Sequence, residues 1–247
     1  MKRTETMNTL LSRMLSHADP SQVEGLSRFF KTGPGQYGEG DRFLGIKVPV
    51  TREVVRGCWK ELCFNDLEEC ITCGYHEVRL AALLALVEIF RHGRKDPSLR
   101  QQCIDFYLAH TRYINNWDLV DLSCYPLLGE WLLPSSDRSL LYHLARSGRT
   151  LWEQRIGIVS TMTFVRHGQL DDTFAIADIL LQHPPDLIHQ AVGWLLREAG
   201  KRDKAALEAY LNGPAGAVAR YRQMPRTMLR YAIEKFPEEE RQQYLQK

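Results

Sequence analysis

A pattern of helical periodicity recurs along this chain at spacings just under 40 residues. Residues 77–93 begin Glu-Val-Arg and end Phe-Arg-His-Gly, while residues 153–168 begin Glu-Gln-Arg and end Phe-Val-Arg-His-Gly with one residue dropped. These two copies lie about 76 positions apart, twice a period of roughly 38. Residues 151–157 and 187–193 also share Leu, Gln and Gly at matching positions. A chain with such repeats is constrained to stack similar structural units.

The residues between these signals predict that the whole chain is helical. Apolar residues recur three and four positions apart, short breaks contain Gly, Pro, Asp or Asn, and no stretch alternates long enough for a convincing strand. Predicted helix starts are Asp137, Thr150, Asp171 and Asp186, and predicted stops are Gly93, Gly148, Gly168 and Gly213. The predicted helices are 5–17, 21–31, 49–61, 65–73, 76–92, 97–111, 116–132, 137–147, 150–167, 172–182, 186–200, 203–212, 215–223, 226–236 and 237–246.

Helix pairs repeating just under every 40 residues are typical of HEAT-like proteins. Such pairs cannot bury their apolar faces alone, so they stack into one curved solenoid. We therefore expect an all-α, HEAT-like solenoid with a concave, partly basic face, forming a single domain over residues 1–247. Within it we expect N-terminal helices in residues 1–32, an irregular loop at 33–42, and repeats over about 43–236.

The composition is that of an ordinary globular protein. Formal net charge is +2, with 25% charged and 44% hydrophobic residues, which excludes a disordered chain. No stretch approaches the roughly 18 consecutive apolar residues of a membrane span, and the first residues lead into an amphipathic run rather than a signal segment. We expect a cytoplasmic protein, nucleoid-associated if bacterial, with no membrane partner.

Two patterns suggest other sites but have simpler interpretations. The glycine-containing residues 33–40 lack the preceding strand and the Lys-Ser/Thr ending of a phosphate-binding loop. Cysteines at short spacing suit zinc or an iron-sulfur cluster, but the residues around them have the periodicity of packed helices, which favours buried thiols. The histidines are scattered, so we expect no metal and no cofactor. The cysteines are Cys58, Cys63, Cys70, Cys73, Cys103 and Cys124.

The start of predicted helix 116–132 carries the most suggestive side chains. Asp121 follows Trp117 by one helical turn, so the carboxylate and the indole share a face. This pairing suits a cationic, sugar-like transition state. The alternative is that Asp118 and Asp121 are first-turn acids favoured by the helix dipole.

Trp117, Arg155 and Trp194 recur at nearly the repeat period, so we expect them to line one concave face. Residues 194–235 contain nine Lys or Arg against four acids, an excess that indicates an anionic partner. Arg155, Arg197 and Lys201 beside the two indoles would combine phosphate-binding cations with flat apolar groups. The alternatives are that Arg155 and Arg197 form salt bridges between repeats and that the basic run is a solvated helix surface.

Four motifs resemble those of the AlkD-like DNA alkylation repair glycosylases, which are built from HEAT-like repeats. The resemblance covers about residues 40–236, and the motifs occur in the family's order. Where family members often have an aromatic residue before the motif Trp, this chain has Asn116. The motifs are FLGIKVP at 43–49, NNWDLVD at 115–121, LWEQR at 151–155 and IHQAVGWLLRE at 188–198.

The resemblance implies a role for particular residues. Trp117 and Trp194 match the indoles that hold the deoxyribose of the lesion nucleotide, and Asp121 matches the catalytic carboxylate. Arg155 and Arg197 match cations on the DNA-facing surface. As further DNA-binding residues we expect Arg52, Lys201 and Lys47, of which Arg52 is the weaker match.

The implied chemistry is hydrolysis of the N-glycosidic bond of cationic alkylated purines, of the N3-methyladenine and N7-methylguanine type. A ring-alkylated purine departs as a neutral base, so no general acid is required, and a carboxylate can stabilise the oxocarbenium-like sugar and align a water. We therefore expect a monofunctional DNA glycosylase of base excision repair, acting as a monomer on duplex DNA. The alternative is a non-catalytic HEAT-like scaffold that binds DNA or a protein.

Overall fold

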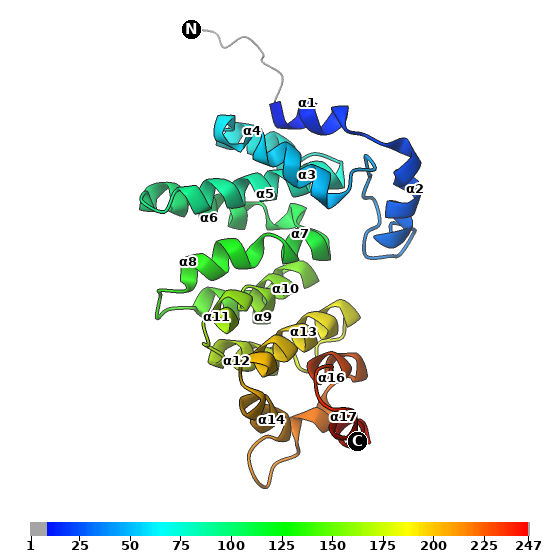
Figure 1. Ribbon diagram of the computed structural model, residues 1–247, viewed down its shortest axis with the longest axis vertical. Helices are drawn as coiled ribbons and strands as arrows, with labels where there is room; N and C mark the ends of the chain where they lie inside the picture. The colour runs from blue at the N-terminus through cyan, green and yellow to red at the C-terminus, as the bar shows by residue number, and fades with distance from the viewer. Residues whose placement is uncertain (1–8, 247) are drawn as a thin grey trace. The chain divides into compact units, whose positions relative to one another are not determined.

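The computed structural model describes residues 9–246, and all of its regular structure is helical (Figure 1). Within that range no strand is formed, and one isolated backbone bridge joins Arg42 to Tyr75. The chain divides into two compact units, residues 1–123 and residues 124–247, which we call unit 1 and unit 2. The single domain expected over residues 1–247, like the concave shape expected of it, stays a prediction.

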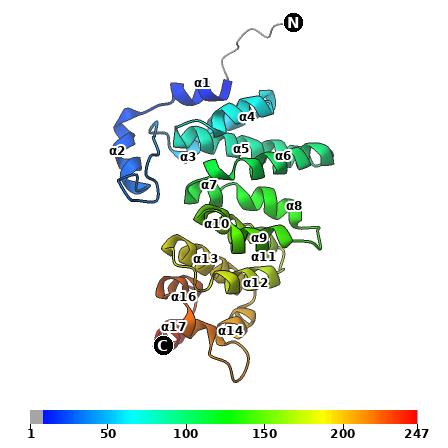
Figure 2. The same ribbon diagram turned by 180° about the vertical axis from the view of Figure 1, so that it is seen from behind.

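Unit 1 is built around one long helix, α5. The twelve residues 76–87 are all buried, because residues 80–87 are apolar on every side and the helix packs against α1, α3, α4 and α6. Figures 1 and 2 show α5 directly beside α3 and α4. The elements of unit 1 are α1 (Thr9–Ser16), α2 (Pro20–Phe29), α3 (Val48–Arg56), a 3-10 turn (Trp59–Glu61), α4 (Phe64–Ile71), α5 (His76–His92), α6 (Pro97–Ala109), a 3-10 turn (Thr111–Tyr113) and α7 (Trp117–Asp121).

Unit 2 is a stack of helix pairs. The helices α10, α13 and α16 pack side by side in that order, while α9 packs on α10 and α12 packs on α13 (Figures 1 and 2). Its elements are a π-helix (Tyr125–Gly129), α8 (Glu130–Leu132), α9 (Ser139–Ser147), α10 (Leu151–Val159), α11 (Met162–Arg166), α12 (Asp171–Leu180), α13 (Asp186–Arg202), α14 (Lys204–Asn212), α15 (Arg220–Gln223), α16 (Arg226–Ala232) and α17 (Glu238–Leu245).

The repeated glycines of unit 2 mark the points where neighbouring helices cross. A Cβ atom on Gly157 would lie 2.8 Å from the carbonyl oxygen of Leu141, and one on Gly193 would lie 2.5 Å from that of Met228. Glycine at these matching positions therefore lets α10 approach α9 and lets α13 approach α16. The predicted helical-repeat fold is confirmed, and the shared glycine of the two sequence copies has a packing reason.

Most predicted helix signals are confirmed. Thr150 caps α10 by accepting a hydrogen bond from the backbone of Glu153, and Gly93, Gly148 and Gly213 end helices. Asp137 is the exception: it accepts from the backbone N–H of Ser139, where α9 begins two residues later than expected.

Several predicted helices are interrupted or shorter than expected. The helix expected at 49–61 ends at Arg56, before a separate 3-10 turn, and the helix expected at 226–236 ends at Ala232. The helix expected at 116–132 stops at Asp121, and Pro126 then prevents a regular helical hydrogen bond where the π-helix forms. The helix expected at 150–167 ends at Val159 and resumes at Met162. The helix expected at 215–223 covers only 220–223, because Gly216 has a positive φ of 83°.

The cysteines behave as packed thiols rather than as a cluster. Those at 58, 70, 103 and 124 are buried, those at 63 and 73 are partly exposed, and all six are free. Among residues 9–246, no group of three or more His, Cys, Asp or Glu side chains is arranged to hold a metal ion. No helix in the same range is long and apolar enough to cross a membrane.

Candidate functional site

An apolar cavity of about 430 Å³ lies in unit 1 at the short helix α7. Aromatic and aliphatic side chains from α2, α3, α5 and the loop before α3 form most of its wall. Its lining residues are Leu26, Phe29, Phe30, Phe43, Ile46, Lys47, Val48, Pro49, His76, Glu77, Leu80, Trp117, Asp118, Asp121 and Leu122.

The indole of Trp117 is held in this cavity by two phenyl rings. It stacks on Phe30 with ring centroids 5.5 Å apart, and the ring of Phe29 meets it edge-on at 5.9 Å. Phe29 is 61% exposed, which is unusual for a large apolar side chain and leaves the cavity partly open. The local sequence fixes the start of α7, because the buried Asn116 side chain accepts a hydrogen bond from the backbone N–H of Trp117.

The carboxylates at 118 and 121 have different surroundings. Asp118 is 3% exposed and accepts a hydrogen bond from Nε2 of His76 at 2.8 Å. Asp121, the last residue of α7, is half-buried and lines the cavity together with Trp117. The indole and carboxylate that share a helical face in the sequence therefore border the same cavity. Neither acid is simply a solvent-exposed residue of a first helical turn.

Of the two predicted cations of unit 1, one reaches this cavity. Lys47 is exposed, precedes the first turn of α3 and lines the cavity. Arg52 is exposed one turn further along α3 and is not a lining residue. Lys47 therefore puts a positive charge at a largely apolar wall that also includes His76 and three carboxylate side chains.

The FLGIKVP segment owes its conformation to Glu77 on α5. Both carboxylate oxygens of Glu77 accept from the backbone N–H of Leu44, and Oε1 also accepts from Gly45 and Ile46, at 2.9–3.1 Å. A carboxylate with several N–H donors is well stabilised inside a protein. This interaction brings Lys47 and Ile46 to the cavity wall.

Unit 2 contains a second cavity, of about 510 Å³, beside Trp194 on α13. The indole is half-buried, and Lys201 from the same helix lines the cavity with it. Two exposed cations that the sequence analysis did not select also line it, Arg166 and Arg202. They are the last residues of α11 and α13, and repeat periodicity alone gives no reason to single them out.

Arg197 and Lys201 are joined by one carboxylate. Glu198 Oε1 accepts from Lys201 Nζ at 2.7 Å and lies 3.3 Å from Arg197, which also pairs with Glu234 on the segment after α16. The salt-bridge alternative thus applies to Arg197, whose partner Glu234 lies beyond α16, whereas the Lys201–Glu198 pair lies within α13. Lys201 remains exposed beside these contacts and can meet a ligand without unfolding the chain.

Arg155 is the most enclosed of the predicted DNA-binding residues. It lies on α10, is 5% exposed, and donates a hydrogen bond to the backbone carbonyl of Leu187 at the start of α13. This bond ties two neighbouring helices of unit 2 together. Contact of Arg155 with DNA, like the shared face expected for it with Trp117 and Trp194, stays a prediction.

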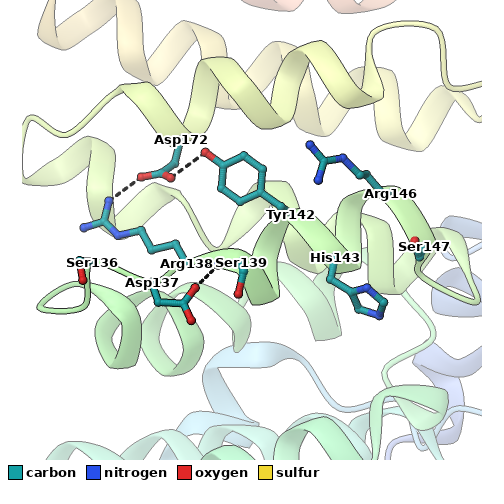
Figure 3. A pocket seen from close by; sticks show the side chains of 9 residues that line it. All are labelled: Ser136, Asp137, Arg138, Ser139, Tyr142, His143, Arg146, Ser147 and Asp172. Atoms are coloured by element: carbon teal, nitrogen blue, oxygen red, sulfur yellow. Dashed lines mark hydrogen bonds and ion pairs between the residues drawn. The ribbon is translucent and has the colours of Figure 1, made fainter.

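A third cavity, of about 590 Å³, lies in unit 2 at α9, and its charges are largely paired with each other. Figure 3 shows Asp172 between Arg138 and Tyr142; the carboxylate is 2.5 Å from the guanidinium and accepts from the tyrosine hydroxyl at 2.8 Å. Burial and the neighbouring Asp172 raise the pKa of Tyr142 to about 12. In the same view His143 points away from this pair, whereas the guanidinium of Arg146 lies 5.8 Å from the centre of the Tyr142 ring. The cluster fastens α12 to α9 and contains none of the predicted site residues.

The fold and these cavities define a helical-repeat protein in which an indole and a cation share a cavity wall in each unit, Trp117 with Lys47 and Trp194 with Lys201. A sequence profile of the family described as DNA alkylation repair enzyme matches residues 10–236. The chain belongs to that family, which assigns it a role in the repair of alkylated DNA and makes DNA its partner.

A solved structure described as a predicted DNA alkylation repair enzyme from Enterococcus faecalis is similar in fold, with a TM-score of 0.66 and 14% sequence identity. The match covers 90% of this chain and 97% of that chain. At this identity the likeness concerns the fold alone. A comparison with curated protein sequences finds no relative of this chain.

Proposed function

We propose that this protein is a monofunctional DNA glycosylase that hydrolyses the N-glycosidic bond of cationic alkylated purines in duplex DNA. The observation that carries the proposal is the presence of Trp117 and Asp121, one helical turn apart, at the wall of the same apolar cavity. A carboxylate beside an indole in a largely dry environment is suited to stabilising a cationic sugar.

The proposed chemistry needs few protein groups. N3-methyladenine and N7-methylguanine carry positive charge in the nucleotide and leave as neutral bases, so no proton has to be supplied to the base. As the bond to the base lengthens, the deoxyribose gains oxocarbenium character, which the negative charge of Asp121 favours. The same carboxylate can orient a water for attack at the anomeric carbon, and Trp117 can contact the sugar through its negative ring face.

The residues of unit 2 have a proposed part in binding. Trp194 would contact a deoxyribose, while Arg197 and Lys201 would contact phosphates, with Arg155 as a further cation. Support comes from the cavity at Trp194, which Lys201 also lines. In unit 1 the proposed phosphate contacts are Lys47 and Arg52, both of which are exposed.

The direct test is release of a free base. The protein is incubated with duplex DNA methylated by an alkylating agent, and released N3-methyladenine and N7-methylguanine are quantified by chromatography and mass spectrometry. We expect release well above spontaneous loss from the same DNA. Tight DNA binding without any base release would contradict the glycosylase and support the non-catalytic scaffold.

A further inference from the structure

The imidazole of His76, at the first turn of α5, lies between two carboxylates. Its Nε2 is 2.8 Å from Oδ2 of Asp118 on α7, and its Nδ1 is 3.1 Å from Oδ2 of Asp41 in the loop before α3. The residue is 1% exposed, with the ring of Phe43 stacked on it at 4.8 Å and the ring of Phe30 tilted against it at 4.7 Å. The contact therefore joins three segments far apart in the sequence inside unit 1.

Arg79 extends this cluster to the residues before α7. Its Nη2 donates to Asp41 at 2.7 Å and to the side chain of Asn115 at 3.0 Å, and its Nη1 donates to the carbonyl of Cys73 at 3.2 Å. Asn115 also donates to Asp41 at 3.4 Å. Both sides of Trp117, at 115 and at 118, are thus tied to the same buried cluster.

The cluster is electrically balanced when His76 is protonated. Each carboxylate accepts from a different ring nitrogen, so both nitrogens must carry hydrogen. Burial opposes protonation, but hydrogen bonds to Asp118 and Asp41 and the charge of Asp118 outweigh it and raise the pKa of His76 to about 9. The imidazolium and Arg79 then match the two carboxylates, which is the condition for holding such charges away from water.

Helix α7 needs this support because it has only five residues. A helix of that length is unstable alone, because the free-energy cost of nucleation exceeds the stabilisation from its few hydrogen bonds. Asn116 caps it, while Asp118 accepts both the backbone N–H of Leu119 at 2.9 Å and the hydrogen of His76. The orientation of α7 is therefore set chiefly by groups outside the helix.

We propose that the His76–Asp118 pair, supported by Asp41 and Arg79, is a positioning device that holds Trp117 and Asp121 at the cavity wall for the excision step. The proposal rests on the proposed function. His76 also lines the cavity, but both of its nitrogens are engaged by carboxylates, so it acts through α7 and donates no proton to the base.

The first test compares His76→Gln with the wild-type protein in single-turnover excision at saturating protein. We expect the excision rate to fall by between about tenfold and about 100-fold, as when a reacting group is slightly misplaced, while the Kd for the same DNA changes by less than about twofold. His92→Gln, an exposed histidine at the other end of α5, is the matched control and should excise normally. Excision by His76→Gln at the wild-type rate would overturn the proposal.

A second measurement does not depend on activity. Hydrogen exchange at the backbone amides of residues 119–123 should be faster in His76→Gln than in the wild type, while exchange in α6 should be unchanged. An equal increase throughout unit 1 with normal excision per folded molecule would overturn positioning in favour of general stability. If the wild type releases no base but α7 exchange responds as expected, the proposed function fails and the positioning of α7 stands.

Asp118→Asn tests the same pair by a milder change, and it carries the test if His76→Gln does not fold. The asparagine amide can donate to a neutral imidazole, so the geometry is retained without the charges. We expect Asp118→Asn to excise more slowly than the wild type but faster than His76→Gln, and the double variant to lose no more than His76→Gln alone. If His76→Gln does not fold, excision by Asp118→Asn at the wild-type rate would overturn the proposal. Independent, multiplicative losses from the two substitutions would contradict their action as one unit.

Discussion

The backbone N–H of Gly45 donates to Glu77 Oε1 at 2.9 Å, and the φ of Gly45 is +87°. The same glycine packs against the start of α2, where a Cβ atom would lie 1.9 Å from the carbonyl oxygen of Asp19. Asp19 in turn donates its backbone N–H to the carbonyl of Leu44 at 2.8 Å. One residue without a side chain thus lets α2, the FLGIKVP segment and α5 meet.

Gly45→Ala is expected to destabilise unit 1. Placing an alanine at a positive φ alone costs roughly 1 kcal/mol, and the loss should be larger here because the methyl group must also displace the backbone of Asp19. Gly40→Ala is the matched control: its φ is also +87°, yet a Cβ atom there has no neighbour within 4 Å. Urea denaturation followed by circular dichroism measures both. Equal losses in the free energy of unfolding would show that the contact with α2 adjusts easily.

Asp121→Asn is expected to lower the rate of base release by at least about 100-fold, while DNA binding changes little. The amide keeps the size of the side chain but not its negative charge. Single-turnover excision and fluorescence-anisotropy binding measure the two effects. Asp105→Asn, an exposed acid on α6, is the control. Full base release by Asp121→Asn would refute the proposed mechanism.

Arg155→Ala is expected to weaken DNA binding and to reduce the slope of log Kd against log salt by about 1, the loss of one phosphate contact. Arg149→Ala is a useful comparison, because this side chain is 79% exposed and pairs with Glu153 at 3.0 Å. If Arg155 only ties α10 to α13 through the Leu187 carbonyl, its loss will lower the melting temperature and leave the salt slope unchanged.

The stability of the protein should depend on pH through His76. Its pKa rises from 6.5 to about 9 on folding, so the stabilisation is fully present below pH 6.5 and is lost as pH rises through about 9. The contribution is on the order of 3 kcal/mol, at about 1.4 kcal/mol per pKa unit. Denaturation curves between pH 6 and pH 9.5 should show this decline in the wild type and a smaller one in His76→Gln.

Much of the helical architecture follows from local sequence signals. Thr150 has a side chain that caps a helix start, Gly213 reaches a positive φ that ends one, and Gly157 and Gly193 repeat because helices cross at both. Such effects depend on neighbouring residues or on a recurring spacing, so they can be predicted. The break after Val159 is not predicted, because the apolar pattern continues across Ser160 and Thr161.

The candidate site is only partly predictable. Trp117 and Asp121 share a helical face by their spacing alone, and both border the same cavity. The surroundings of Asp118 are not predictable in this way. Tertiary packing brings its partner His76 to α7, together with Asp41 on the other ring nitrogen of His76, and no periodicity links positions so far apart. Hydrogen bonds of that kind are visible only after the chain has folded.

The hydrogen bonds from three consecutive backbone amides to Glu77 have a further consequence. Those N–H groups point inward to the carboxylate. The backbone at residues 44–46 therefore has no free donor that could bind a phosphate. The positive charge of this segment comes from the side chain of Lys47. Its ionic contribution can therefore be tuned by substitution at the surface without altering the path of the backbone.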